Sequence, residues 1–242
     1  MEPHVNHRFI LEFARRNAVS GKTLDYGCGS GQVVRAGLQL GLEIYGCETF
    51  YDGGHGSKSN AADLMGSRIF EMKDGKIPFP DDHFDCVVNN MVFEHVHDID
   101  HTLSEICRVM KPGGRLLSLF PSLEVLREGH CGVPLAHRLC KYRKLGYYWL
   151  LAFRCLGFGY FTEGKGRRQW AGDFHQWINS YCVYRPRKQI LQSFSAHALE
   201  TTAFEKEYLR FRRVPILTTW MLRKFGFMVL LSRKPAVSQV LK

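Results

Sequence analysis

Residues 24–31 read Leu-Asp-Tyr-Gly-Cys-Gly-Ser-Gly, and this stretch decides the fold. A short apolar run from Lys22 predicts a strand before it, and the apolar spacing of residues 33–40 predicts a helix after it. Glycines at such a junction let the backbone turn sharply and approach a ligand closely. The following helix contributes unpaired N–H groups and the positive end of its dipole. We therefore expect a ligand-binding turn, although a turn of this kind also occurs in nicotinamide-binding proteins.

The residues after the turn extend this unit. A second strand is predicted over 42–47 and ends at Glu48, so the strand, glycine turn, helix and strand together form a βαβ unit. An acid at this place can accept hydrogen bonds from both hydroxyls of a ribose. The first two strands therefore predict a site for a nucleoside-containing cofactor.

Strands and helices alternate along the first half of the chain. Helices are predicted at 6–19 and 98–110, the second ended by Lys111-Pro-Gly-Gly114, and further strands at 67–73, 84–89 and 115–120. After residue 184 we expect a helix at 187–196, a strand near 202–211, a helix near 216–225 and a last strand at 227–233. Such alternation predicts a parallel α/β sheet.

Two segments resemble a known family. LDYGCGSG resembles the first motif of class I S-adenosylmethionine-dependent methyltransferases, and Glu48 lies where that family has its ribose-binding acid. Residues 78–117, PFPDDHFDCVVNNMVFEHVHDIDHTLSEICRVMKPGGRLL, resemble its proline loop, fourth strand, "EH" segment, helix and "KPGG" turn. The resemblance covers residues 22–120 well, the last strand loosely and residues 121–184 hardly at all. It implies a Rossmann-like, doubly wound, mostly parallel seven-stranded sheet with an insertion after strand five.

The same resemblance implies the cofactor contacts. The glycines would shape the pocket for the methionine part of S-adenosylmethionine, Asp25 would hold the turn or meet the amino group through water, and Glu48 would bind the ribose. Two positions depart from the family pattern: Glu48 replaces the commoner Asp, and Asp74 comes one position late for an adenine contact. The full set of expected cofactor-binding residues is Asp25, Tyr26, Gly27, Cys28, Gly29, Gly31, Glu48, Thr49, Asp74, Gly75, Asn89, Asn90 and Met91.

His95 is the candidate catalytic residue. It follows the fourth strand, on the side of the sheet where α/β proteins bind ligands, and an ordinary imidazole pKa of about 6.5 suits proton transfer near neutrality. A base is needed only where the acceptor must lose a proton. The alternative is that His95 only forms a hydrogen bond or packs beside the pocket.

No metal site is expected. Glu94, His95, Asp98 and His101 could supply ligands, but a polar helix surface explains them equally well. The eight cysteines contain no CxxC pair and are expected to be reduced.

Charge divides the chain into unequal halves. Residues 1–121 carry 12 Lys or Arg against 16 Asp or Glu, and residues 122–242 carry 21 against 7. We expect a cofactor-binding core at 1–120, an insertion or lid for the acceptor at 121–184, and the last part of the same domain at 185–242. The basic half indicates an anionic partner or, alternatively, only a solvated face.

The insertion, residues 121–184, is aromatic and basic. The run 145–161 carries one charge, Arg154, and basic residues flank it, which suits burial against the sheet, a lid, or contact with an anionic membrane surface. Trp170, Asp173, His175 and Trp177 are candidate acceptor contacts or, alternatively, core aromatics and a helix cap. His130 and His137 allow the same two interpretations.

These observations predict a methyltransferase whose acceptor is a small molecule or is linked to a lipid or sugar, with methylation on oxygen favoured. The alternatives are an RNA methyltransferase that uses the basic half, a cofactor-binding protein without catalysis, and a nicotinamide-dependent enzyme. Against the nucleic-acid reading, Asn89-Asn90-Met91-Val92 is not the Asn/Asp-Pro-Pro-aromatic run of base-methylating enzymes. No stretch of 18 residues lacks a charge, and the first residues lack the order of a secretory signal, so we expect a cytoplasmic protein, at most peripheral to a membrane.

Overall fold

The computed structural model describes residues 4–18, 21–50, 58–215 and 218–236. Seven strands form one sheet in the order β3-β2-β1-β4-β5-β7-β6. The strands from β3 to β5 run parallel, and β7 runs antiparallel to both β5 and β6. The predicted mostly parallel, doubly wound sheet is confirmed. The strands are β1 Thr23–Tyr26, β2 Ile44–Glu48, β3 Ile69–Glu71, β4 Phe84–Asn90, β5 Met110–Phe120, β6 Glu200–Ala203 and β7 Met228–Arg233.

Helices cover both faces of the sheet. Buried side chains of α1, α2 and α8 pack on one face, and those of α3 and α7 pack on the other. A central strand such as β4 is buried on both faces: Cys86 and Val88 point to the first group and Val87 to the second. The helices of this part are α1 Val5–Asn17, α2 Gln32–Gln39, α3 Ile99–Val109, α7 Arg187–Ala196, α8 Glu205–Phe211 and α9 Thr219–Phe225, with a short 3₁₀ turn at Lys58–Ala61.

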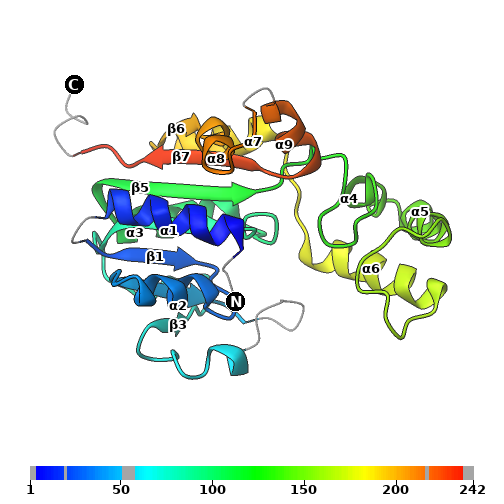
Figure 1. Ribbon diagram of the computed structural model, residues 1–242, viewed down its shortest axis with the longest axis horizontal. Helices are drawn as coiled ribbons and strands as arrows, with labels where there is room; N and C mark the ends of the chain where they lie inside the picture. Colours follow the sequence, from blue (N-terminus) through cyan, green and yellow to red (C-terminus); the bar gives the residue numbers. More distant parts are fainter. Residues whose placement is uncertain (1–3, 19–20, 51–57, 216–217, 237–242) are drawn as a thin grey trace.

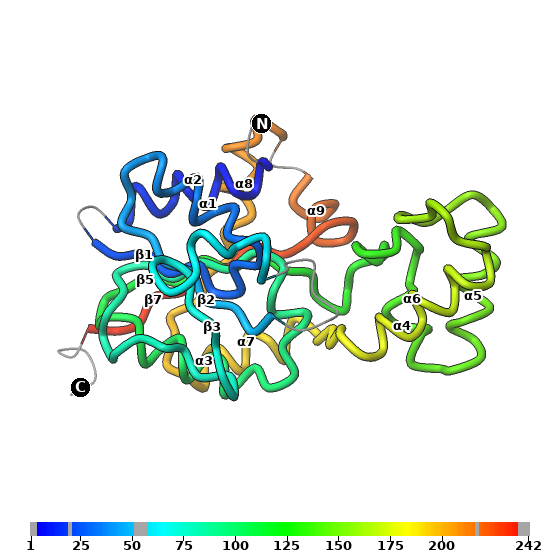
Figure 2. The backbone as a smooth tube through the Cα atoms, turned by 90° about the horizontal axis from the view of Figure 1, so that it is seen from below, coloured from blue at the N-terminus to red at the C-terminus, as the bar shows by residue number. Residues whose placement is uncertain are grey.

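The insertion forms a separate helical unit. Its helices are α4 Ala136–Leu139, α5 Arg143–Cys155 and α6 Arg167–Tyr181. They lie to one side of the sheet, beyond the carboxyl ends of β1 and β5 (Figures 1 and 2). A core of their own holds them together around Leu150, Trp170 and Ile178. The insertion therefore stands where the parallel strands end, which is where ligands bind in open α/β sheets.

Two predicted elements differ from the structure. The strand expected near 202–211 is wrong beyond residue 203, because Tyr208 and Leu209 are buried on the inner face of helix α8. Strand β5 begins at Met110 and includes Lys111-Pro-Gly-Gly114, with a register shift where it pairs with Phe84 and Cys86. The helix expected near 216–225 is present as α9, although residues 216–217 lie outside the described residues.

In the part of the chain that the structure describes, no helix combines the length and apolar character needed to span a membrane.

Candidate active site

The turn between β1 and α2 depends on its glycines. Gly27, Gly29 and Gly31 have φ values of 73°, 54° and 78°, in the left-handed region that favours glycine. A Cβ added to Gly27 would lie 2.5 Å from a methyl group of Val92, and one added to Gly31 would lie 2.4 Å from Ile69. The turn therefore passes directly beside the segment that follows β4.

One cavity opens beside this turn. The glycine-turn pocket, as we call it, has a volume of about 280 Å³. It lies between the ends of β1 and β4, where the strand order of the sheet reverses. Its lining residues are His7, Asp25, Gly27, Cys28, Gly29, Ser30, Gln32, Val33, Asn90 and Met91.

A second cavity lies on the other side of Gly27. The His95 pocket, about 430 Å³, brings residues of the core together with Ser180 and Tyr181 of helix α6. Gly27 lines both pockets, so they are adjacent. The remaining lining residues are Tyr26, Glu48, Thr49, Met72, Gly75, Val92, His95, Val96, His97, Asp98, His101 and Thr102.

Hydrogen bonds hold the side chain of Glu48 beside the glycine turn. Its carboxylate accepts hydrogen bonds from the backbone N–H of Gly29 and from that of Thr49, both at 2.8 Å. The acid identified at the end of the second strand therefore lies beside the glycines, as the sequence predicts.

Asp25 lies beneath the turn, at the end of β1. It is buried, and it lines the glycine-turn pocket. Burial, together with the negative charge of Glu48, raises its pKa to about 8. A cationic group entering this pocket would favour ionisation of Asp25, because a nearby positive charge lowers the pKa of a carboxyl.

Three of the expected cofactor contacts line neither pocket. Asn89 is buried in the sheet, where its side-chain amide donates to the hydroxyl of Ser118 at 2.9 Å. Asp74 is exposed at a residue with φ of 51°, whereas its neighbour Gly75 lines the His95 pocket. Gly31 is required by the close approach of Ile69 rather than by a pocket.

His95 lies in the segment after β4 and faces the insertion. Its Nδ1 is 2.7 Å from the carbonyl oxygen of Tyr181. A carbonyl only accepts, so Nδ1 carries the proton and the lone pair of the neutral ring lies on Nε2. The ring packs edge-on against Trp177 and His130.

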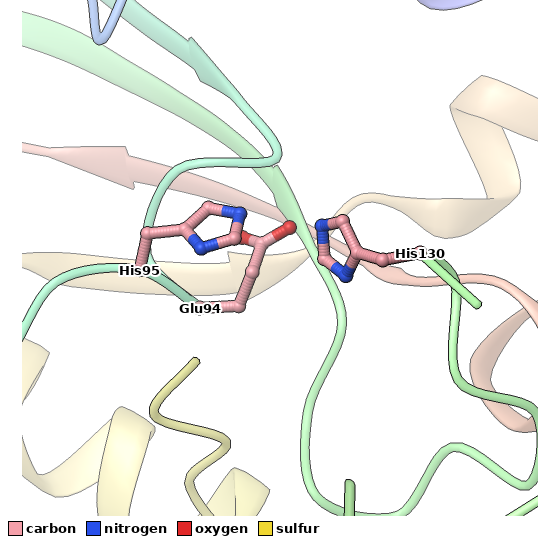
Figure 3. A group of neighbouring side chains, drawn as sticks. All are labelled: Glu94, His95 and His130. Atoms are coloured by element: carbon pink, nitrogen blue, oxygen red, sulfur yellow. The ribbon is translucent and has the colours of Figure 1, made fainter. Parts of the chain in front are cut away.

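His95 belongs to a cluster with Glu94 and His130. One carboxylate oxygen and one nitrogen from each imidazole lie within 4.8 Å of one another and point toward a common centre (Figure 3). Glu94 is buried, and burial raises its pKa to about 8 despite the opposing influence of His130. The sequence places Glu94 and His95 together as possible ligands, but it does not associate His130 with them, because His130 lies 35 residues after His95 and on the insertion.

Glu128 forms a hydrogen bond with the ring of His130. The Nδ1 of His130 lies 2.6 Å from the Glu128 carboxylate, which also accepts from the hydroxyl of Tyr184 at 2.7 Å. Burial alone would raise the pKa of Glu128, but these hydrogen bonds and the charge of His130 lower it to about 2. The carboxylate in turn raises the pKa of His130 against the effect of burial.

A third cavity of about 320 Å³ lies within the insertion, and we call it the insertion pocket. Asp173 and Trp177, two of the candidate acceptor contacts, are one helical turn apart on α6 and line this cavity. Trp170 does not, because it is fully buried and donates its indole N–H to the carbonyl of Tyr160. His175 lies on another face of α6, beside Asn179. The other lining residues are His130, Phe161, Lys165 and Phe174.

Arg185 joins the insertion to the segment that carries His95. Its buried guanidinium donates to the backbone carbonyls of Phe93, Val96 and His97, and to that of Val183. The chain returning from the insertion is therefore tied to the residues on both sides of Glu94 and His95.

The methyltransferase-domain family matches residues 2–206. The chain belongs to this family. The match includes the glycine turn, Glu48, the His95 segment and the whole insertion. It confirms the class predicted from the sequence, an S-adenosylmethionine-dependent methyltransferase.

Curated relatives match the methyltransferase over short segments. It is 36% identical over 91 residues to the ubiquinone/menaquinone biosynthesis C-methyltransferase UbiE of Pseudomonas paraeruginosa, an alignment that covers 37% of this chain and 32% of that protein. It is 51% identical over 43 residues to the protein of the same name from Francisella tularensis, covering 18% and 17%. The chain thus matches a third or less of the length of these relatives.

Solved structures share the fold. An S-adenosylmethionine dependent methyltransferase from Mesorhizobium loti matches with a TM-score of 0.57 and 15% identity, over 95% of this chain and all of that chain. A geranyl diphosphate methyltransferase solved with GPP and sinefungin matches with a TM-score of 0.52 and 14% identity, over 95% and 76%. At such identities the likeness concerns the fold alone.

Sequence reasoning missed several residues that line the pockets of the methyltransferase. His7 reaches the glycine-turn pocket from α1, whose Asn6 donates to Asn90 at 3.0 Å. Ser180 reaches the His95 pocket from the end of α6. The amphipathic pattern of residues 6–19 predicts helix α1 but not what it covers, and nothing in the insertion sequence indicates which end of α6 meets the core.

Proposed function

We propose that this chain transfers the methyl group of S-adenosylmethionine to a hydroxyl oxygen of a small, largely apolar acceptor, free or linked to a lipid or sugar. One observation carries the proposal: a single pocket is lined by the glycine turn, Glu48 and His95 from the core and by Ser180 and Tyr181 from the insertion. Cofactor and acceptor residues thus share one space, as a direct transfer between two bound molecules requires.

The residues of the glycine-turn pocket and the adjoining end of β2 suit the cofactor. S-adenosylmethionine supplies a methyl group on a sulfonium; its transfer breaks the S–CH₃ bond, forms the O–CH₃ bond and leaves the electron pair on sulfur. Glu48 offers carboxylate oxygens to the ribose hydroxyls, and its bonds to Gly29 and Thr49 hold it in position. Asp25 offers a carboxylate to the ammonium of the methionine part.

His95 is suited to take the proton of the acceptor hydroxyl. Its Nδ1–H donates to the Tyr181 carbonyl, which orients the ring and keeps the lone pair on Nε2. In this step Nε2 accepts the hydroxyl proton while the oxygen forms its bond to the methyl carbon. The backbone of Tyr181 thereby acts as the orienting group of the base.

The insertion pocket suits the apolar part of an acceptor. Phe161, Phe174 and Trp177 supply aromatic faces, and Lys165 supplies a cation that is held by Asp173 at 2.8 Å. A ring or prenyl-like chain carrying an anionic group would find both kinds of contact there.

The test is a cofactor titration followed by an acceptor screen. Calorimetric titration with S-adenosylmethionine and with NAD should give binding of the first alone. A screen of lipid-linked, phenolic and phosphorylated-sugar acceptors with radiolabelled cofactor should then give a methylated product. We expect His95→Gln to retain cofactor binding and to lose at least about a hundredfold in turnover, as removal of a general base does.

The matched control is His175→Gln, which changes a histidine on α6 that lines none of the three pockets. Full turnover by His95→Gln would contradict the assignment of His95 as the base. Absence of S-adenosylmethionine binding by the wild type would contradict the whole proposal.

Methylation on carbon is the second candidate. The identity to C-methyltransferases over 91 residues favours it. An acceptor phenol deprotonated by His95 would carry extra electron density at its ring carbons, so the same base would serve. The attacked carbon forms the C–CH₃ bond as the S–CH₃ bond breaks, and it then loses its hydrogen as a proton while the phenol oxygen regains one. Mass spectrometry and NMR of the product distinguish a methoxy group from a C–CH₃ group.

We also propose that the insertion meets an anionic lipid surface from which it takes the acceptor. Its large exposed apolar side chains are Tyr142, Leu145, Tyr148, Leu156, Phe158, Tyr160 and Phe161. Exposed cations lie at or near both ends of this run: Lys141, Arg143, Lys144, Lys165, Arg167 and Arg168. Aromatic and aliphatic groups mixed with lysine and arginine are typical of interfacial contact.

A further inference from the structure

We propose that Glu94, His95 and His130 bind one divalent transition-metal ion, with Zn²⁺ as the representative, at the junction of the core and the insertion. The inference rests on the proposed methyl transfer and specifies how the acceptor hydroxyl is activated. The argument begins with Glu94.

Glu94 is a buried carboxylic acid for which the structure gives no hydrogen-bond partner. Its side chain is 2% exposed. Neither of its carboxylate oxygens has a hydrogen bond within the described residues. A buried polar group without a partner is costly, and metal coordination is one of the few ways to satisfy a buried carboxylate. A ligand bound to the carboxylate oxygens of Glu94 would remove this cost.

The two histidines are oriented as metal ligands are. The Nδ1 of His95 donates to the Tyr181 carbonyl, and the Nδ1 of His130 donates to Glu128. In metal sites the non-coordinating nitrogen of a histidine almost always donates to a carbonyl or carboxylate in this way. The Nε2 atoms are then the candidate ligand atoms, and one nitrogen of each ring points toward the centre of the cluster (Figure 3).

The ligand set selects the class of ion. Two imidazoles and one carboxylate suit Zn²⁺, Co²⁺ or Fe²⁺, whereas Mg²⁺ and Ca²⁺ prefer oxygen ligands. The three ligand atoms lie within 4.8 Å of one another. Tetrahedral zinc ligands at about 2.0–2.1 Å from the ion are roughly 3.3 Å apart, so binding requires the side chains to move inward by about 1.5 Å or less. Three protein ligands leave a fourth position open.

The position of the cluster gives the ion a role. His95 lines the His95 pocket and His130 lines the insertion pocket, so the ion would lie between the proposed cofactor and acceptor sites. At its open position it would bind the acceptor hydroxyl and lower the pKa of that hydroxyl, as bound metal ions do for water. The proton passes to solvent, and the oxygen then forms its bond to the methyl carbon as the S–CH₃ bond breaks. In the metal-loaded protein Nε2 of His95 is a ligand, so the ion replaces His95 as the activating group.

Metal binding by the full chain provides the test. After treatment with a chelator and its removal, the protein is titrated with Zn²⁺ by calorimetry and with Co²⁺ by visible absorption. We expect one ion per chain and the intense absorption of four-coordinate Co²⁺. Glu94→Gln and His130→Gln should each weaken binding at least about a hundredfold, and Glu128→Gln about ten- to hundredfold.

Controls match each change. Glu163→Gln alters an exposed glutamate of the insertion, and His175→Gln alters a histidine outside the pockets; both should bind Zn²⁺ as the wild type does. Circular dichroism checks the fold of every variant, and the wild-type titration stands independently of all of them.

The outcomes separate this inference from the proposed function. Absence of Zn²⁺ and Co²⁺ binding by the wild type, or unchanged affinity in a folded Glu94→Gln protein, overturns the metal site and leaves His95 as the base. Metal binding without S-adenosylmethionine binding overturns the proposed function and leaves the site.

Discussion

Glu48 holds the end of β2 to the glycine turn, and it is the residue on which cofactor affinity should depend most. Replacing it with Gln removes the charge from the hydrogen bonds that we assign to the ribose hydroxyls. Hydrogen bonds to charged groups contribute about 1.5–3 kcal/mol, so we expect the Kd for S-adenosylmethionine to rise about ten- to hundredfold in a calorimetric titration.

Glu43→Gln is the matched control, because it makes the same change on an exposed glutamate just before β2 that contacts Tyr45 and Lys22. Equal affinities in the two variants would contradict the assignment of Glu48.

Asp25 should give the protein a pH-dependent stability. Its native pKa of about 8 lies above the ordinary value of 3.8, so the native state holds a proton that the unfolded state has lost. Its contribution is full below about pH 4 and is lost as the pH rises through 8. The free energy of unfolding should therefore fall over this range, by at most about 1.4 kcal/mol per pH unit, and Asp25→Asn should remove that slope.

Urea unfolding at pH 5 to 9 without cofactor measures this effect. Asp63→Asn is the control: its ion pair with Arg35 is exposed and lowers its pKa, so it contributes no slope above pH 5. Parallel profiles for the wild type and Asp25→Asn would show that Asp25 is ionised in the native state.

At the scale of elements, the β1–α2 turn combines a strained backbone with a lack of space. Gly27 and Gly41 have the same φ of 73°, but an added Cβ meets Val92 at Gly27 and nothing within 4 Å at Gly41. Gly41→Ala should cost only the left-handed strain, about 1–2 kcal/mol. Gly27→Ala should cost more and should weaken S-adenosylmethionine binding more than tenfold, because both pockets border it. Urea unfolding and calorimetry compare Gly27→Ala with Gly41→Ala. Equal losses of stability and of affinity in the two variants would show that the Val92 side chain moves away from the added Cβ.

The sequence predicts best those elements whose residues follow one another closely and whose apolar spacing matches the side chains that are buried. Strand β1, its glycine turn and Glu48 follow one another closely along the chain, so local rules suffice to place them together. The segment 202–211 was predicted poorly because Glu205–Phe211 packs as a helix through Tyr208, whose hydroxyl bonds to Asn6 on α1. That contact joins residues 202 positions apart in the sequence, so no local sequence pattern predicts it.

The candidate site likewise has one part that local sequence motifs predict and one part that they do not. Its cofactor half comes from motifs read in order along residues 25–91. The cluster of Glu94, His95 and His130 depends instead on how the insertion folds back, so the sequence pairs Glu94 with His95 as possible ligands but does not associate His130 with them.

At the scale of the whole molecule, the insertion carries seven of the eleven large apolar side chains that are exposed among the described residues. Burial of residues 145–161 against the sheet was one of the interpretations; Leu150 is buried instead in the core of the insertion, and Leu145 and Tyr148 are 52% and 63% exposed. We expect the protein to co-sediment with vesicles containing anionic lipid at low salt and to be released from them by high salt. Replacing both Leu145 and Tyr148 with Ser should reduce binding severalfold.

Leu40→Ser serves as the control, because Leu40 is equally exposed at the end of α2, on the core rather than the insertion. If the wild type fails to bind anionic vesicles at low salt, the insertion surface has another partner or none.

The bonds of Arg185 have a consequence for protein engineering and for divergence within the family. They attach the insertion to backbone carbonyls of the core, which every residue type provides, rather than to particular side chains. Related insertions carrying an arginine at this point could therefore be exchanged between cores without redesign of the joint. On the proposed function, we expect such a chimera to keep cofactor binding and to take the acceptor of the donor insertion. Lysine could not replace the arginine, because it lacks the planar fork that reaches several carbonyls at once.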